Sequence, residues 1–287
     1  MAITAEQVKA LRDRTGAGMM DCKAALVESG GDMDQAVDLL RKRGLAQAAK
    51  KAGRATSEGL IGVFISADQR QGAMAEVNCE SDFVARTDDF KALAQQVAAD
   101  IAAAGDKATE AFLTDPHGPV QPKVAAAIGK LGENMGVARF VRFAGDGHVG
   151  SYIHLGGKIG VLVEMAAVAP EVAARDEFKT LVKEVAMQVA AASPQYAQRG
   201  EIPADVLERE KAVYRGQLEG SNKPAQVIEK IIEGKLGSFY EQVVLPDQPS
   251  IRDPKVTVSQ MLVAAGQSLG ASLEVTRFAR LRVGETA

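Results

Sequence analysis

Tryptophan is absent from this chain of 287 residues, and only two residues are cysteine. Cys22 and Cys79 lie far apart and neither belongs to a CxxC pair, which argues against a disulfide framework or a cysteine metal site. So few cysteines favour a reducing compartment. No apolar run approaches the roughly 20 residues that a bilayer-spanning helix needs. Residues 1–7 also lack the charged-then-apolar pattern of a signal peptide. We therefore expect a cytoplasmic protein with no membrane partner.

An excess of positive charge is also absent, because the formal net charge is −3. Proteins whose main task is to coat nucleic acid need a basic surface, so we expect no nucleic acid partner. Basic side chains do gather at residues 41–43 and 50–54, but the preference of helix C-termini for cations explains them equally well.

Motifs that would indicate nucleotide binding or catalysis are missing or out of place. Residues 145–150 fit GxGxxG, but a strand pattern follows them, whereas a phosphate site there needs the start of a helix. Residues 266–270 fit GxSxG, but a helix pattern precedes them and every histidine lies upstream. No GxxxxGK, HExxH or HxxxH spacing occurs. We therefore expect no cofactor, no metal, no direct nucleotide binding, and a binding protein rather than an enzyme.

The chain does contain an internal repeat, with an offset of about 88 residues. Residues 59–104 fall on residues 147–192 without a gap, and the match has about 16 identities in roughly 46 positions. Each copy has two short apolar runs around a hairpin loop, then apolar residues at helical spacing. The strands predicted in this way cover residues 60–65, 73–77, 149–155 and 159–168.

A third strand closes each copy, because residues 137–143 resemble residues 275–281. A helix is predicted before each of them, at 122–131 and 257–267. Apolar and basic residues alternate in both strands, as in a strand with one buried face. The basic residues are predicted to cover the solvent face of each sheet; they are Arg139, Arg142, Arg277, Arg280 and Arg282. The same arginines are the best support for an alternative function, that of an RNA-binding or ribosome-associated protein.

The second copy is longer because of an insertion, which is predicted to be a helical hairpin at residues 204–245. Its helices are predicted at residues 205–218 and 225–244, and Gly, Asn and Pro at residues 219–224 separate them. The second helix carries an apolar stripe formed by Val227, Ile228, Ile231, Ile232, Leu236, Phe239 and Tyr240. Packing against the first helix explains this stripe better than a partner site does.

Three short helices are predicted ahead of the repeat, in residues 1–46, and Thr4 with Gln7 has the spacing of a capping box. Residues 47–57 are predicted to be a linker. The two half-domains are predicted at residues 58–145 and 146–287. Together these elements predict an α+β fold, in which a helical N-terminal domain precedes two half-domains that each combine helices with a three-stranded antiparallel sheet.

Residues 78–86, NCESDFVAR, stand where a strand pattern gives way to a polar loop. An aromatic residue at the tip of such a loop, Phe83, is well placed to enter a partner. The alternative is that Phe83 packs against the start of the following helix as a hydrophobic staple. Its counterpart in the second copy is Glu171, so the shared scaffold does not require an apolar residue at this position.

Three segments together resemble the bacterial translation elongation factor Ts family, and the resemblance extends over residues 3–284. They are the loop at 78–86, residues 11–23 (LRDRTGAGMMDCK) and residues 151–161 (SYIHLGGKIGV). The resemblance implies a ubiquitin-associated-like (UBA-like) fold for the N-terminal helices, and a coiled-coil hairpin associated with homodimer contacts. It also implies a guanine-nucleotide exchange factor for elongation factor Tu, a GTPase that holds GDP and Mg²⁺.

The roles of single residues are implied by the same resemblance. Asp82 and Phe83 would enter between helices beside the Mg²⁺ of the partner. The whole loop that displaces the metal would be Ser81, Asp82, Phe83, Val84, Ala85 and Arg86. A helix of the partner's nucleotide domain would contact Arg12, Met19 and Met20. His154 would contact the same partner.

Two departures from the family pattern stand out. Ser81 occupies a position where the family usually has threonine, and because the hydroxyl is kept we expect little effect. Some members carry a further helix beyond the last strand. Since this sequence ends at Ala287, we expect any partner contact of that helix to be absent or replaced.

Overall fold

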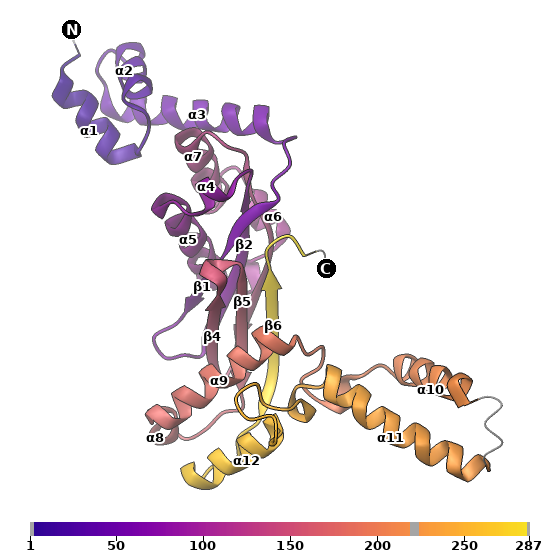
Figure 1. The fold of residues 1–287 in the computed structure, drawn as a ribbon. Coiled ribbons are helices and arrows are strands. Elements are labelled where there is room, and N and C mark those ends of the chain that lie inside the picture. The colour runs from indigo at the N-terminus through magenta and orange to yellow at the C-terminus, as the bar shows by residue number, and fades with distance from the viewer. Residues whose placement is uncertain (1–2, 219–223, 286–287) are drawn as a thin grey trace.

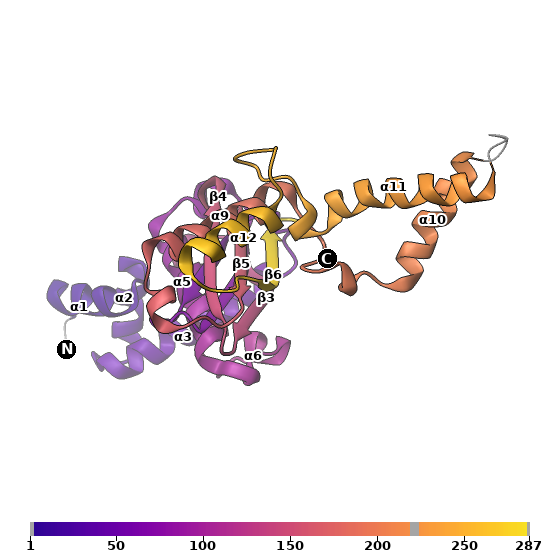
Figure 2. The same cartoon turned by 90° about the horizontal axis from the view of Figure 1, so that it is seen from below.

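The computed structural model describes residues 3–218 and 224–285, so the helix break expected at 219–224 lies almost wholly outside the described residues. Figure 1 shows an elongated molecule. A helical bundle lies at the N-terminal end, the strands lie in the middle, and a helical hairpin projects from the opposite end. Figure 2 shows that this hairpin stands clear of the rest of the molecule.

The N-terminal bundle consists of α1 (Ala5–Thr15), α2 (Met19–Glu28) and α3 (Met33–Lys51). The capping box is confirmed: the Gln7 amide donates to the Thr4 hydroxyl, and the Thr4 amide donates to the Gln7 side chain. The bundle closes around a small core of its own, formed by Val8, Leu11, Cys22, Ala25, Leu26 and Ala36. This arrangement fits the expected UBA-like domain.

The predicted repeat is present as two half-domains, each with a three-stranded antiparallel sheet. The first has the sheet order β1-β2-β3 and consists of β1 (Glu58–Ile65), β2 (Gln71–Cys79), α4 (Asp82–Ala85), α5 (Asp88–Ala104), η1 (Gly105–Lys107), α6 (Glu110–Thr114), α7 (Gln121–Leu131) and β3 (Met135–Ala144). The second has the order β4-β5-β6 and consists of β4 (His148–His154), η2 (Leu155–Gly157), β5 (Ile159–Met165), α8 (Pro170–Ala173), α9 (Asp176–Ala192), η3 (Arg199–Glu201), η4 (Leu245–Asp247), α12 (Val258–Leu269) and β6 (Val275–Arg282). The correspondence extends to a β-bulge, which follows Glu76 in β2 and Glu164 in β5.

Two strands end earlier than the sequence predicted. β4 ends at His154, because Leu155 takes a left-handed backbone conformation with φ 50°. β5 ends at Met165 rather than at residue 168, because the chain then turns toward α8, which begins at Pro170.

α3 is longer than expected, because it continues to Lys51 and so occupies the first part of the linker predicted at 47–57. The cause is tertiary packing. Ala48 belongs to the core of the first half-domain. Gly44 lies so close to α7 that a Cβ atom there would sit 3.3 Å from the carbonyl oxygen of Ala125. The linker prediction was therefore wrong for its first residues, and the bundle is joined to the body through α3.

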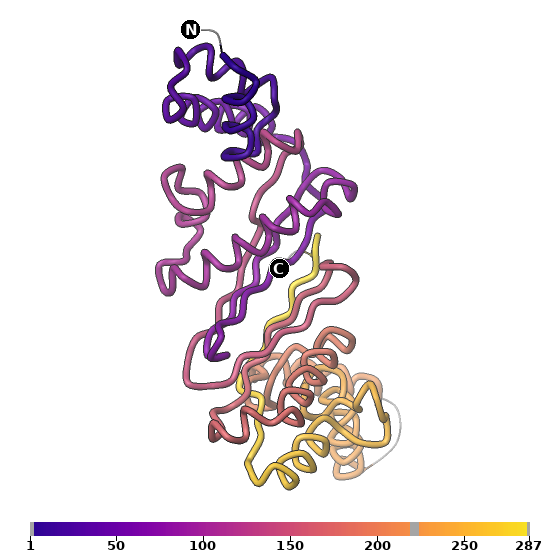
Figure 3. The backbone as a smooth tube through the Cα atoms, turned by 90° about the vertical axis from the view of Figure 1, so that its left-hand side faces the viewer, coloured from indigo at the N-terminus to yellow at the C-terminus, as the bar shows by residue number. Residues whose placement is uncertain are grey.

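The two sheets pack face to face, and α5 and α9 cover their outer faces. Figure 3 shows the strands of both halves side by side in the middle of the molecule. Glycines permit the close approach: a Cβ atom on Gly160 would lie 2.4 Å from Ile61, and one on Gly72 would lie 2.7 Å from Val149. The apolar layer between the sheets is formed by Ile61, Met74, Phe143, Val149, Leu162 and Leu281. The central strands β2 and β5 are thus buried on both faces.

The arginines of the third strands were predicted to cover the solvent face of each sheet, but four of them form ion pairs within the fold. Arg139 pairs with Glu76 at 2.7 Å, and Arg277 pairs with Glu164 at 2.6 Å. The two carboxylates are only 3% and 9% exposed, so each pair lies between the sheets. Each arginine also donates to a carbonyl oxygen of the opposite half-domain, namely Arg282 for Arg139 and Ala144 for Arg277. The pairs therefore hold the two halves together.

Two further arginines of the alternation are also engaged. Arg142 pairs with Asp106 at 3.1 Å, and Arg280 pairs with Glu285 at 3.0 Å. Both arginine side chains are mostly buried, whereas Arg282 is exposed. The prediction was wrong for Arg139, Arg142 and Arg280, because ion pairing and burial of their stems occupy them instead. Arg277 is ion-paired as well, but 44% of its side chain remains exposed.

The inserted hairpin is formed by α10 (Ala204–Leu218) and α11 (Ala225–Val243), as predicted. Of its apolar stripe, Ile232 and Leu236 are buried. The helix α10 lies alongside α11 and contacts it (Figure 2). The base of the hairpin has a separate small core, to which Ile202, Val206, Leu207, Phe239, Tyr240, Val243 and Val244 contribute.

Candidate functional site

The loop after β2 is a short, well-anchored helical turn. Ser81 is the N-cap of α4, and its hydroxyl accepts a hydrogen bond from the Val84 amide. Val84 and Ala85 face inward, and Ala85 is fully buried in the core of the first half-domain. With the inner face of this turn fixed, Phe83 points away from the core.

Phe83 is 79% exposed, which is the largest exposed fraction among the exposed large apolar residues of the described chain. The sequence predicted an exposed aromatic residue at this position, and the exposed fraction of Phe83 confirms it. Asp82 beside it is paired with Arg86 at 2.7 Å across one helical turn. The same turn of the second half-domain, α8, exposes Glu171 in place of the aromatic residue.

A second exposed surface lies on the N-terminal bundle. Met19 and Met20 open α2 and are 56% and 73% exposed, while Arg12 is exposed near the end of α1. Cys22, Ala25 and Leu26 of α2 fill the bundle core instead. Val27 is exposed on the same helix and was not singled out by the sequence.

The third surface is the end of β4. The His154 ring stacks on Tyr152, and its Nδ1 lies 3.0 Å from the Tyr152 hydroxyl. The next residue, Leu155, is 66% exposed. The exposure of Leu155 was not predicted, because the sequence pattern predicts a strand that extends through residue 155. The two glycines that follow Leu155 were the available signal for a turn.

The ends of β2 and β4 lie at the same end of the paired sheets. Glu58, the first residue of β1, pairs in register with Cys79, after which the Phe83 loop begins. Lys158, directly after η2, bonds to Glu58 and to the Gly59 carbonyl. The structure therefore brings the Phe83 loop and the His154–Leu155 turn to one region. The helices α1 and α2, which carry Arg12, Met19 and Met20, lie farther off in the bundle (Figure 1).

Electrostatics around the loop are dominated by carboxylates that accept backbone amides. The Asn134 amide donates to Glu80 at 2.6 Å, and this bond, together with Arg54, lowers the pKa of Glu80 from its ordinary value. Burial, with the Glu133 carboxylate nearby, raises the pKa of the Cys79 thiol to about 11. A thiol of that pKa is protonated at neutral pH, so Cys79 is not set up as a nucleophile.

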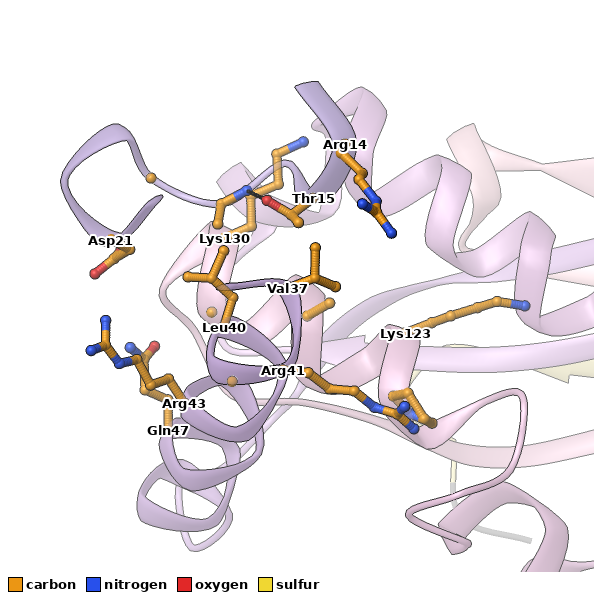
Figure 4. A pocket seen from close by; sticks show the side chains of 16 residues that line it. Arg14, Thr15, Asp21, Val37, Leu40, Arg41, Arg43, Gln47, Lys123 and Lys130 are labelled. Atoms are coloured by element: carbon orange, nitrogen blue, oxygen red, sulfur yellow. Dashed lines mark hydrogen bonds between the residues drawn. The ribbon is translucent and has the colours of Figure 1, made fainter. Parts of the chain in front are cut away.

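A cavity of about 330 Å³ is lined by residues of the N-terminal bundle and of α7, beside the contact between α3 and α7 (Figure 4). Its floor includes Val37 and Leu40, and cationic side chains stand around it. Most of these cations already have a carboxylate partner, as in the pairs Arg14–Asp34, Arg43–Glu28, Lys123–Asp100 and Lys130–Asp89. The cavity therefore offers little uncompensated charge, and the bundle contacts the body mainly through α3.

Within residues 3–218 and 224–285, no three His, Cys, Asp or Glu side chains are grouped in a way that could hold a metal ion. The same part of the chain contains no helix that is long and apolar enough to cross a membrane.

Comparison with known proteins gives consistent matches. Residues 80–285 match the family model described as Elongation factor TS. The chain is 46% identical to Elongation factor Ts of Trichlorobacter lovleyi, with 99% of this chain and 94% of the relative covered. It is 45% identical to the protein of the same name from Nitratidesulfovibrio vulgaris (100% and 98% covered) and 42% identical to that of Aquifex aeolicus (99% of each).

Proposed function

Because this chain belongs to the elongation factor Ts family, we propose that it is a guanine-nucleotide exchange factor for elongation factor Tu. It acts in the cytoplasm during translation elongation, through protein–protein contact and not as an enzyme. The single observation that carries the mechanism is the outward Phe83 on a turn whose inner face is anchored in the core. An exposed aromatic on a rigid support is suited to enter another protein.

The physical task is to weaken the hold of the GTPase on GDP. A GTPase retains GDP through phosphate contacts and the Mg²⁺ that bridges them. Burial of the exposed part of the Phe83 side chain in the partner would supply roughly 1.2–2.4 kcal/mol, which can offset a small separation of packed helices beside the metal. Asp82 would enter with Phe83, and its ion pair with Arg86 holds the carboxylate against the helical turn.

The other exposed residues would supply affinity. Met19 and Met20, with Arg12, offer a flexible apolar contact for a helix of the nucleotide domain. His154 would contact the same partner, and Leu155 adds an exposed apolar side chain beside it. The hairpin α10–α11 would provide contacts for a homodimer. Isolated chain is expected to bind neither GDP nor GTP.

The rival function, RNA or ribosome binding, loses its main support. Four of the five arginines that suggested it are engaged in ion pairs within the fold. A salt titration separates the two functions, because RNA binding weakens steeply with salt.

The test is the release of a fluorescent GDP analogue from elongation factor Tu, with and without this protein. We expect catalytic amounts to accelerate release, and a pull-down with EDTA to yield the GTPase without nucleotide in roughly equimolar amount. Unchanged release, or tight binding of nucleotide to the isolated chain in equilibrium dialysis, would overturn the proposal.

A further inference from the structure

Glu133 lies under the Phe83 loop and accepts three hydrogen bonds from it. The amides of Glu80 and Ser81 donate to one carboxylate oxygen at 3.1 and 2.9 Å, and the Ser81 hydroxyl donates to the other at 2.5 Å. Hydrogen bonds to a charged acceptor are stronger than neutral ones. A single side chain thus fixes both the backbone and the capping hydroxyl at the start of α4.

The support of Glu133 is itself well defined. It follows Gly132, which ends α7 with φ 82°, and the Lys51 ammonium donates to the Gly132 carbonyl at 2.8 Å. The next residue, Asn134, donates its backbone amide to Glu80 and its side-chain amide to the Arg54 carbonyl. Glu133 therefore projects from a turn that is tied to the end of α3 as well as to the loop.

The second half-domain shows what the fold requires without this device. Its equivalent helix, α12, ends at Gly270 with φ 69°, as α7 ends at Gly132. The residue that follows is Ala271 where the first half has Glu133. The turn α8 has Ala169 as its N-cap, without any side-chain cap. The same scaffold thus folds without the carboxylate and the hydroxyl, and both are present only in the half that carries Phe83.

We propose that Glu133 is a positioning residue for nucleotide exchange, which holds the Ser81 turn so that Phe83 is presented in one orientation. The inference rests on the proposed function of the Phe83 loop. A loop that has to be ordered when it enters the partner loses part of its interaction energy to that ordering, whereas a loop ordered in advance does not. Glu133 touches neither the partner nor the nucleotide in this account, and acts through Phe83.

The test uses the full chain with the substitutions Glu133→Ala and Ser81→Ala, and with Glu171→Ala as a matched surface control. The release of the GDP analogue is measured over a range of factor concentrations, which separates the maximal rate from the half-saturating concentration. We expect the maximal rate to fall about tenfold for Glu133→Ala and several-fold for Ser81→Ala. Glu171→Ala should behave like the parent protein.

Two further measurements identify the cause. Amide hydrogen exchange of the free protein should become faster at Glu80 and Ser81 in Glu133→Ala, while β2 stays protected. In the Phe83→Ala background, Glu133→Ala should cause no further loss of rate, because a residue that acts through Phe83 has nothing left to position.

The outcomes are distinguishable. If Phe83→Ala slows exchange but Glu133→Ala and Ser81→Ala do not, the positioning role is wrong and the proposed function stands. If Phe83→Ala itself leaves exchange unchanged, the proposed function of the loop fails, and the role of Glu133 fails with it. Additive losses in the double variant would show that Glu133 acts elsewhere. Should Glu133→Ala not fold, Ser81→Ala carries the same comparison.

Discussion

Replacing Phe83 by alanine separates a partner-binding role from a structural role. In the folded chain Phe83 is 79% exposed, so only about a fifth of its side chain is removed from water by folding. Full burial of a phenylalanine is worth roughly 1.5–3 kcal/mol. Phe83→Ala should therefore lower the free energy of unfolding by only about 0.3–0.6 kcal/mol.

The expected effect on exchange is much larger. If the exposed four fifths of Phe83 is buried in the partner when GDP leaves, its loss removes roughly 1.2–2.4 kcal/mol from that state. Since every 1.4 kcal/mol is a factor of ten, the release rate should fall roughly 7- to 50-fold.

Both quantities are measured on the same preparations, as the urea midpoint of the free chain and the release rate of a fluorescent GDP analogue. Phe90→Ala is the matched control, because Phe90 lies a short distance along the same chain and is fully buried. That control should lose about 3–5 kcal/mol of stability. A collapsed midpoint for Phe83→Ala, with an unchanged rate per folded molecule, would refute the reasoning.

Three other perturbations follow from the structure. Replacing residues 208–238 by a short linker should leave a cooperative unfolding transition, because Leu207 and Phe239 meet in the core at the base of the hairpin and the cut preserves them. Burial, with Lys179 as a second cause, lowers the pKa of His148, so the free energy of unfolding should fall as the pH drops below about 6.5. His148→Leu should reduce this loss, as urea midpoints at pH 5.5 and 7.5 would show. Cys79, buried and with a raised pKa, should react with iodoacetamide only when the chain opens, as peptide mass analysis of native and unfolded protein would show.

Each of these has a contrary outcome. Loss of the cooperative transition would make the hairpin part of the body rather than an insertion. An acid sensitivity that is identical in His148→Leu would assign it to other groups. Rapid native labelling of Cys79 would mean that the Phe83 loop opens far more often than its hydrogen bonds suggest.

Much of the architecture was predictable because the sequence contains an internal repeat. The repeat located both sheets, and local signals located helices: the capping box predicted at Thr4 is present as a hydrogen-bonded pair. The errors arose where tertiary contacts override local pattern. The end of α3 is helical because Ala48 packs on another domain, and no residue of the segment itself reports that contact.

The prediction that the arginines of the third strands cover a solvent face was wrong for a related reason. Alternation of apolar and basic residues tells which residues share a face, but not which face meets water when a second sheet covers the first. Arg139 and Arg277 lie on the face between the sheets, where the buried Glu76 and Glu164 accept them. A buried carboxylate in a strand was the available signal, because such a group needs a cation or donor nearby.

Comparison of the two half-domains separates the features that the fold requires from those that it does not. The β-bulge, the buried Glu–Arg pair and the left-handed glycine after the last helix occur in both halves, so the fold alone accounts for them. The aromatic tip at Phe83, the capping Ser81 and the carboxylate of Glu133 occur in the first half only. Exposing a large aromatic costs solubility and brings a monomer no stability. Because the second half folds with Glu171 and Ala271 at these positions, the fold does not demand the three residues. The proposed entry of Phe83 into a partner would account for them together.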